Sequence, residues 1–217
     1  MRQPTGIVLA GGQSTRFGRD KASALLQGRT LLDWVVSAIA PAVGSIVVST
    51  SRGQSLPPLP PLDVPLRIIE DEMRAVGPLA ALTAALATAP PGAFCFVASC
   101  DVPLLTTPLV GLLLSIASAG AYDAIVPVVA GRSQPLVAVY DRERCFRDFR
   151  SALAAGEGAL AGGLAGLSVL EVPEGALRTA DPDLRSFLNV NRPEDLATAA
   201  ALMAGTPPPR APTNSWS

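Results

Sequence analysis

Short apolar runs alternate with longer segments of helical spacing from residue 6 to residue 129. The short runs have the length and the Val and Ile content of buried strands, and they occupy 6–10, 45–49, 66–69, 93–99 and 124–129. The longer segments repeat apolar residues at helical intervals, and they occupy 31–40, 78–89 and 107–119. This alternation predicts an α/β fold with a mixed, mostly parallel sheet and helices on both faces.

The pattern changes after residue 130, where strands and helices alternate less regularly. We expect, in order, a strand at 134–141, a helix at 145–156, a strand at 166–172, an extended segment at 185–191 and a helix at 193–204. A single domain is predicted over 1–204, with a Pro-rich, disordered tail at 205–217. The Pro-rich stretch at 55–65 is interpreted as a surface connection inside this domain.

Composition narrows the chemistry that the chain can perform. The net charge is −1 without a long run of one sign, which argues against a nucleic-acid binder. The chain has no histidine, so it lacks the usual general base near neutral pH, the commonest transition-metal ligand and any Ser-His or Cys-His pair. Catalysis would therefore depend on carboxylates, Lys, Arg, backbone amides and Mg²⁺.

The cysteines and the apolar stretches indicate the compartment. Three cysteines without C-x-x-C spacing suggest neither a disulfide scaffold nor a zinc site, and they are best interpreted as buried thiols. The N-terminus has no signal-peptide pattern, and the most apolar stretches, near 79–89 and 109–121, are too short to span a membrane. We expect a cytoplasmic protein with no membrane contact.

A glycine-rich segment follows the first predicted strand. Gly11 and Gly12 precede QSTRFGRDK, so backbone amides there could approach an anion, although the segment matches neither the P-loop nor the dinucleotide fingerprint. Lys21 is the only lysine, since the other sixteen of the seventeen basic residues are arginine. A compact ammonium reaches between phosphate oxygens in a way that a planar guanidinium does not. Lys21 is therefore predicted to bind phosphates from an exposed loop; the alternative is a turn with a solvated charged tip.

Two acidic residues follow other predicted strands, at the edge where open α/β sheets bind ligands. Asp101 comes directly after the strand at 93–99, where a carboxylate can hold Mg²⁺ over a triphosphate, or can serve only as a turn or N-cap residue. Asp71 follows the strand at 66–69, and a solvated acidic turn is the stronger alternative there because Glu70 and Glu72 flank it.

With these motifs the chain resembles the molybdenum cofactor guanylyltransferases, members of the nucleotidyltransferase superfamily with a Rossmann-like fold. The resemblance covers about residues 5–204 and rests on LAGG…R.G.DK at 9–21, IIED at 68–71, GPLAAL at 77–82, CDVP at 100–103 and FLNVNRPEDL at 187–196. The first motif alone is typical of the whole superfamily, which includes sugar-phosphate nucleotidyltransferases. The closing motif narrows the resemblance to molybdopterin enzymes.

The resemblance implies roles for the matching residues. Nucleotide binding would involve Leu9, Ala10, Gly11, Gly12, Lys21, Ser49, Asp71, Gly77 and Asp101. The catalytic residues would be Arg16, Lys21 and Asp101, with Asp101 as the Mg²⁺ ligand. Asn189 and Asn191 would line the side where the pterin substrate binds.

The reaction implied by the resemblance joins GTP and Mo-molybdopterin into a guanine dinucleotide with release of pyrophosphate. In this family LAGG goes with guanine, whereas cytidylyl relatives tend to carry LAAG, so Gly11 favours GTP. No general base is needed, because the terminal phosphate of molybdopterin is already ionised. We expect a monomer that contacts molybdenum-insertion or molybdoenzyme-maturation proteins only transiently.

Three departures from the family pattern keep alternatives open. STSR at 49–52 stands where relatives often have an Asn-containing turn, so Ser49 or Ser51 would supply any hydrogen bond there. Gln134-Pro135 stands where relatives often have His-Pro, and GEGALAGG at 156–163 lacks the basic residues that often follow its first two positions. One alternative is a nucleotidyltransferase that uses CTP or a sugar-phosphate acceptor. Another is a non-catalytic nucleotide-binding domain on the same fold.

Overall fold

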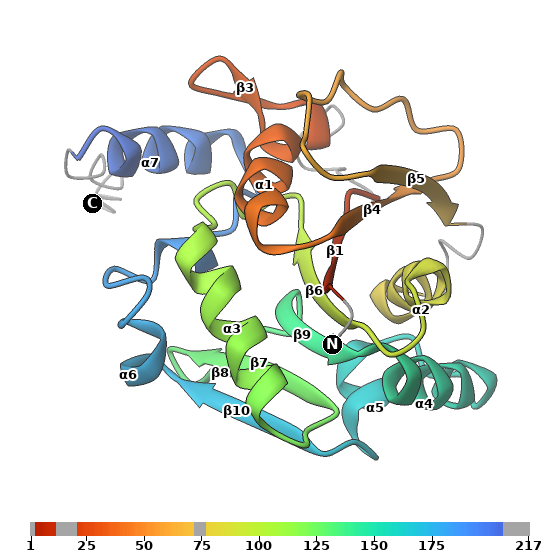
Figure 1. Ribbon diagram of the computed structural model, residues 1–217. Coiled ribbons are helices and arrows are strands. Elements are labelled where there is room, and N and C mark those ends of the chain that lie inside the picture. The colour runs from red at the N-terminus through yellow and green to blue at the C-terminus, as the bar shows by residue number, and fades with distance from the viewer. Residues whose placement is uncertain (1–2, 12–20, 72–76, 206–217) are drawn as a thin grey trace, which may run out of the picture.

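A computed structural model describes residues 3–11, 21–71 and 77–205 of the 217-residue chain (Figure 1). In these residues, eight strands form one sheet with the order β10-β7-β9-β6-β1-β4-β5, and β8 pairs with β7. The strands are β1 (Thr5–Leu9), β4 (Ser45–Ser51), β5 (Leu66–Asp71), β6 (Phe94–Ser99), β7 (Ala124–Val129), β8 (Arg132–Ser133), β9 (Val137–Asp141) and β10 (Val169–Pro173).

Strand directions match the predicted mostly parallel sheet. β1 runs parallel to both β4 and β6, β4 runs parallel to β5, and β7 runs parallel to β10. β9 lies between β6 and β7 and is antiparallel to both, while β8 forms a short hairpin with β7. The α/β fold class is confirmed, and β9 makes the sheet mixed.

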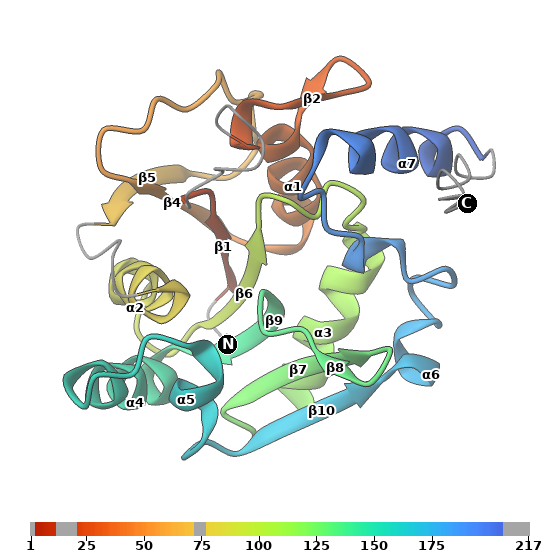
Figure 2. The same cartoon turned by 180° about the vertical axis from the view of Figure 1, so that it is seen from behind.

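Helices cover both faces of the sheet, as Figures 1 and 2 show from opposite sides. The longer helices are α1 (Leu31–Ile39), α2 (Pro78–Thr88), α3 (Thr107–Ala119), α4 (Arg142–Ala154) and α7 (Pro193–Met203). The shorter ones are α5 (Leu160–Leu164), α6 (Glu174–Leu177) and the 3₁₀ helices η1 (Lys21–Ser23), η2 (Ala40–Ala42) and η4 (Arg185–Phe187). All of the predicted longer helices are present.

Alternate residues of β1 point into two separate hydrophobic clusters. Val8 packs with the buried side chains of α1 and α3, whereas Ile7 and Leu9 pack with those of α2 and α4. All three residues are less than a tenth exposed. Such continuous burial is what a short apolar run between two helical layers requires.

A smaller third cluster attaches the C-terminal helix to the rest of the fold. The hairpin of β2 (Leu25–Leu26) and β3 (Arg29–Thr30) contributes Leu26, which is buried together with Leu104, Val190 and Ala199. The backbone N–H of Val190 donates to the carbonyl oxygen of Asp101 at 2.7 Å. Residues just before α7 therefore lie against the end of β6.

Three local predictions differ from the structure. Residues 185–191 were expected to be extended, but 185–187 form η4, because the buried Asp181 carboxylate accepts the N–H groups of Arg185 and Ser186. α4 begins at Arg142 rather than 145, because the Asp141 side chain caps its first turn. The 55–65 connection contributes apolar side chains to the first cluster, so it is not only a surface segment. The predicted tail lies outside the described residues from 206 onward.

The cysteine prediction is confirmed, since Cys95, Cys100 and Cys145 are all free and buried. Burial raises the pKa of the Cys95 thiol to about 12, so this thiol stays protonated and unreactive at neutral pH. Across residues 3–11, 21–71 and 77–205, no helix combines the length and the apolar character needed to cross a membrane.

Candidate active site

Four parallel strands end side by side at one edge of the sheet, and the predicted site residues gather there. The register pairs Leu9 of β1 with Ser49 of β4 and with Ser99 of β6. It also pairs Ser51 of β4 with Asp71, the last residue of β5. This is the carboxyl edge, where ligands of open α/β sheets bind.

Lys21 and Asp101 form an ion pair at this edge. The Lys21 ammonium donates to Asp101 Oδ2 at 3.0 Å and to Asn191 Oδ1 at 2.8 Å. The other carboxylate oxygen of Asp101 accepts a hydrogen bond from the Ser99 hydroxyl. The side chains of Lys21 and Asp101 are each only 17% exposed, so the expectation that Lys21 projects from an exposed loop is wrong. Lys21 is the first residue of η1, and its side chain lies against Asp101 and Asn191.

This arrangement can bind an anion. A lysine ammonium has three N–H donors, and the described residues use two of them. The lysine is therefore oriented before any phosphate arrives. Orientation in advance of binding lowers the entropic cost of using a long, flexible side chain.

A cavity of about 220 Å³ lies at the same carboxyl edge, around the ends of β1, β4 and β5. It is lined by Leu9, Gly11, Ser49, Ser51, Asp71, Gly77, Pro78 and Ala81. Five of these were predicted nucleotide-binding residues, namely Leu9, Gly11, Ser49, Asp71 and Gly77. Its volume is below the roughly 300–1,000 Å³ of complete small-molecule sites, which suits one part of a ligand, such as a base.

Glycines at two positions allow this cavity to form. A Cβ atom on Gly11 would lie 3.0 Å from both the backbone nitrogen and the hydroxyl oxygen of Ser51. Gly77 has φ +108°, a conformation that side-chain-bearing residues rarely adopt, and a Cβ there would lie 2.6 Å from the carbonyl oxygen of Gly158. Gly77 thereby directs the chain into α2, whose first residue is Pro78.

Gln54 joins the ends of β1 and β4, a role that the sequence did not suggest. Its side-chain amide donates to the carbonyl oxygen of Ala10 at 3.0 Å and accepts from the N–H of Ser51 at 2.9 Å. The N–H groups of Ala10 and Gly11 both donate to the carbonyl oxygen of Ser49. The backbone on which the glycine-rich segment begins is thus fixed against β4.

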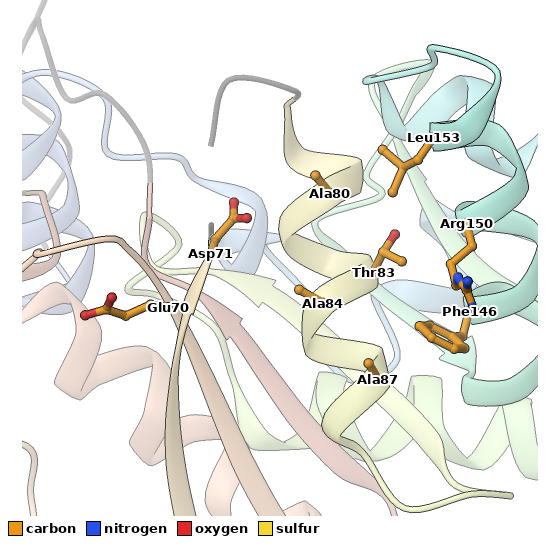
Figure 3. A pocket seen from close by; sticks show the side chains of 9 residues that line it. All are labelled: Glu70, Asp71, Ala80, Thr83, Ala84, Ala87, Phe146, Arg150 and Leu153. Atoms are coloured by element: carbon orange, nitrogen blue, oxygen red, sulfur yellow. The ribbon is translucent and has the colours of Figure 1, made fainter. Parts of the chain in front are cut away.

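A second, larger hollow of about 470 Å³ lies between β5, α2 and α4 and also contacts Asp71 (Figure 3). Figure 3 shows Asp71 at the end of β5 near the first turns of α2, with Glu70 pointing away from that helix. On the far side, the Arg150 guanidinium lies 5.5 Å from the ring centre of Phe146. The walls are mostly alanine and other apolar side chains, so this hollow does not resemble a phosphate site.

The remaining predicted residues fall in different places. Gly12 and Arg16 lie outside the described residues. Asn189 and Asn191 are both exposed, and Asn191 accepts a hydrogen bond from Lys21, so it lies beside the residue predicted to bind phosphate. Within the described ranges, no three His, Cys, Asp or Glu side chains come together as a metal site. A divalent ion at Asp101 would need oxygen ligands from a substrate and from water, as Mg²⁺ commonly has.

Comparisons with known proteins identify the family. A family model described as "MobA-like NTP transferase domain" matches residues 6–171. A protein of Mycobacterium avium named "Probable molybdenum cofactor guanylyltransferase" is 36% identical, with 93% of this chain and 98% of the relative covered. A protein of Desulfosudis oleivorans named "Molybdenum cofactor guanylyltransferase" is 33% identical, with 93% and 96% covered.

Solved structures give the same fold. The molybdopterin-guanine dinucleotide biosynthesis protein A of Archaeoglobus fulgidus superposes with a TM-score of 0.75 at 25% identity, covering 93% of this chain and all of that one. The 2-C-methyl-D-erythritol 4-phosphate cytidylyltransferase of Thermus thermophilus has a TM-score of 0.69 at 21% identity, with 94% and 100% covered, and supports the fold alone. The predicted Rossmann-like nucleotidyltransferase fold is confirmed.

Proposed function

The chain belongs to the MobA-like NTP transferases, and we propose that it transfers GMP from GTP to the terminal phosphate of Mo-molybdopterin. The products are molybdopterin guanine dinucleotide and pyrophosphate. The observation that carries the proposal is that the ion pair between Lys21 and Asp101 and a base-sized cavity share the carboxyl edge of the sheet. Relatives named for guanylyl transfer, similar over nearly the whole chain, support it.

The base of the nucleotide binds in the cavity beside Gly11. Ser49, Ser51 and Asp71 provide hydroxyl and carboxylate oxygens to its lining, and each is less than a tenth exposed. A guanine base offers N–H donors that such oxygens accept. Leu9, Ala10 and Gly12 belong to the same nucleotide-binding segment in this proposal, and Gly77 orients the helix that closes the cavity.

Lys21 and Arg16 would bind the triphosphate, and Asp101 would hold Mg²⁺. The Asp101 carboxylate fits this role because the Ser99 hydroxyl orients one of its oxygens while the other faces Lys21. Bound Mg²⁺ would neutralise charge on the phosphate oxygens. Asp101 would hold the metal ion, and Lys21, which the ion pair keeps at the same edge, would bind the phosphates.

Catalysis then consists of positioning and charge neutralisation at the α-phosphate. The attacking oxygen belongs to an ionised phosphate, so no proton has to be removed, which agrees with a chain that has no histidine. The new bond joins that oxygen to the α-phosphorus, and pyrophosphate leaves with the electrons of the broken bond. Preorganised cations and backbone amides are the main aids available to such a reaction.

Several finer parts of the proposal concern the setting of the reaction. We place it in the cytoplasm, which agrees with three free, buried thiols. A monomeric enzyme, contacts with molybdenum-insertion or molybdoenzyme-maturation proteins, and Asn189 at the pterin side stay predictions. A CTP-dependent reaction is the second candidate, because the segment at 156–163 departs from the family pattern.

Pyrophosphate release tests the proposal directly. GTP and CTP are compared with Mg²⁺, in the presence and absence of Mo-molybdopterin. The proposal expects release from GTP only when Mo-molybdopterin is present. Release from CTP alone would transfer the assignment to the cytidylyl reaction, and release from neither would contradict both.

A further inference from the structure

We infer that Asp195 is a positioning residue for Lys21, acting through Asn191. The inference rests on the proposed role of Lys21 in binding phosphates. Asp195 lies in the first turn of α7 and outside the region matched by the family model. It reaches the site through a short series of hydrogen bonds rather than by touching substrate.

The series begins at one carboxylate oxygen. Asp195 Oδ2 accepts the backbone N–H of Asn191 at 2.7 Å and that of Arg192 at 2.8 Å. Asn191 then presents its side-chain oxygen to the Lys21 ammonium at 2.8 Å. Lys21 completes the series at Asp101, 3.0 Å away. Residues 170 positions apart in the chain are thereby linked at one point.

Asp195 accepts the two backbone N–H groups that lead into α7. Arg192 is the N-cap residue of α7, and its guanidinium carries only donors, so it cannot accept them. Pro193 follows it and carries no N–H of its own. Asp195 therefore satisfies backbone donors that would otherwise depend on water.

The backbone around Asn191 is fixed on two sides. The preceding residue, Val190, is fully buried and donates its N–H to the carbonyl oxygen of Asp101. The following side is held by Asp195. Asn191 itself is exposed, so packing does not choose its conformation, and the fixed backbone has to do so. Replacing Asp195 removes one of these two supports.

The link becomes most important when nucleotide binds. If Asp101 takes Mg²⁺, Lys21 loses its charged partner, and the Asn191 side-chain oxygen is the described contact that still directs the ammonium. A lysine has a long, flexible side chain, so its direction depends on such contacts. Asp195 thus supports the orientation of Lys21 in the state that reacts.

The single lysine gives a spectroscopic test that does not need turnover and is made with Mg²⁺ and GTP bound. With isotope-labelled lysine, the chain yields one set of side-chain signals, all from Lys21. We expect two resolved Cε proton resonances in the wild type, and their collapse to one shift in Asp195→Ala and in Asn191→Ala. Asp195→Asn keeps an oxygen that can accept both N–H groups, so it should retain the wild-type signals. Glu194→Gln, an exposed neighbour in the same turn, is the matched control and should also retain them.

Kinetics provide the second readout. In Asp195→Ala, kcat with GTP and Mo-molybdopterin should fall about tenfold, with a change of less than about threefold in KM for GTP, because geometry rather than binding is lost. Asp195→Asn should restore most of kcat, and Glu194→Gln should match the wild type. Circular dichroism and urea unfolding establish that each variant is folded.

The outcomes separate the inference from the proposed function. Unchanged Lys21 signals in a folded Asp195→Ala variant would overturn the inference. Collapsed signals with an unchanged kcat would also overturn it, because the link would then have no part in the reaction. A wild type that releases no pyrophosphate from GTP would instead contradict the proposed function, while the signals would still report whether Asp195 orients Lys21.

Discussion

Gly11→Ala tests how the base cavity is built. The added Cβ would lie 3.0 Å from the nitrogen and hydroxyl oxygen of Ser51 and 3.2 Å from the carbonyl carbon of Thr50. These atoms cannot easily retreat, since β4 is paired on both sides and the N–H of Ser51 is bonded to Gln54. Gly11 itself has no left-handed φ, so the effect of the substitution is steric contact rather than backbone strain.

Two opposing contributions set the change in the free energy of unfolding of Gly11→Ala. Overpacking of this kind costs about 1–3 kcal/mol. Replacing glycine where the backbone permits alanine recovers about 0.4–1 kcal/mol through the unfolded chain. We therefore expect a net loss of about 1 kcal/mol in the free energy of unfolding, measured by urea denaturation. Gly111→Ala is the matched control: it lies within α3 with no atom near its Cβ position, and should gain up to about 1 kcal/mol.

The same substitution should change the choice of nucleotide. The methyl group enters the wall that Gly11 and Ser51 share, which narrows the cavity. We expect kcat/KM for GTP to fall at least about tenfold, because one methyl group in a closely fitted site changes kcat/KM by about that factor or more. The value for CTP should fall less, because cytosine is smaller than guanine. If Gly11→Ala were as stable as Gly111→Ala and kept the wild-type ratio of GTP to CTP turnover, this description of the cavity would be refuted.

Three further predictions concern charged residues. Lys21→Arg keeps the charge but should lose most activity, as Lys21→Ala should, because a planar guanidinium cannot replace the ammonium between Asp101 and Asn191; wild-type turnover in Lys21→Arg would contradict the role. Asp101→Asn should abolish Mg²⁺-dependent GTP binding measured by calorimetry, and unchanged Mg²⁺ dependence would exclude it as the metal ligand. The hydrogen bonds from Arg29 hold the pKa of Asp33 below its ordinary value, against the opposing effect of burial. The ionised Asp33 carboxylate therefore stabilises the fold fully above about pH 4, and this stabilisation is lost as pH falls through the folded-state pKa. The free energy of unfolding of Asp33→Asn, measured in urea, should vary less between pH 5 and 2.5 than that of the wild type. Equal pH dependence of the two would exclude this contribution.

The hydrophobic pattern predicted the centre of the sheet because the strands β1, β4 and β6 are buried on both faces. The segments at 6–10 and 93–99 are continuous apolar runs, and they became neighbouring parallel strands. The direction of β9 was not predicted, because hydrophobicity carries no direction. The short connection from Val129 to Val137 was an available signal, since parallel strands need a crossover of about a dozen residues. β2 and β3 have two residues each, which is too short for any periodicity to show.

The site was predictable to the extent that strand ends indicate ligand positions. Asp101 comes just after the buried strand β6 and Asp71 is the last residue of the edge strand β5, and the sheet brought both to the carboxyl edge. The partners of Lys21 could not be derived from sequence spacing, because Asn191 is 170 residues away and its approach depends on the buried Val190. Gln54 left no signal either, because a side chain that bridges two backbones in a turn has no characteristic motif.

The central claim is that the α-phosphate of GTP is transferred to molybdopterin at the Lys21–Asp101 pair. The most direct measurement follows labelled GTP in the presence of Mo-molybdopterin and Mg²⁺. The account predicts that an α-phosphate label enters a pterin dinucleotide, that a γ-phosphate label leaves as pyrophosphate, and that Lys21→Ala abolishes both. An α-label that stays in free guanine nucleotides, or a dinucleotide formed equally well by Lys21→Ala, would contradict it.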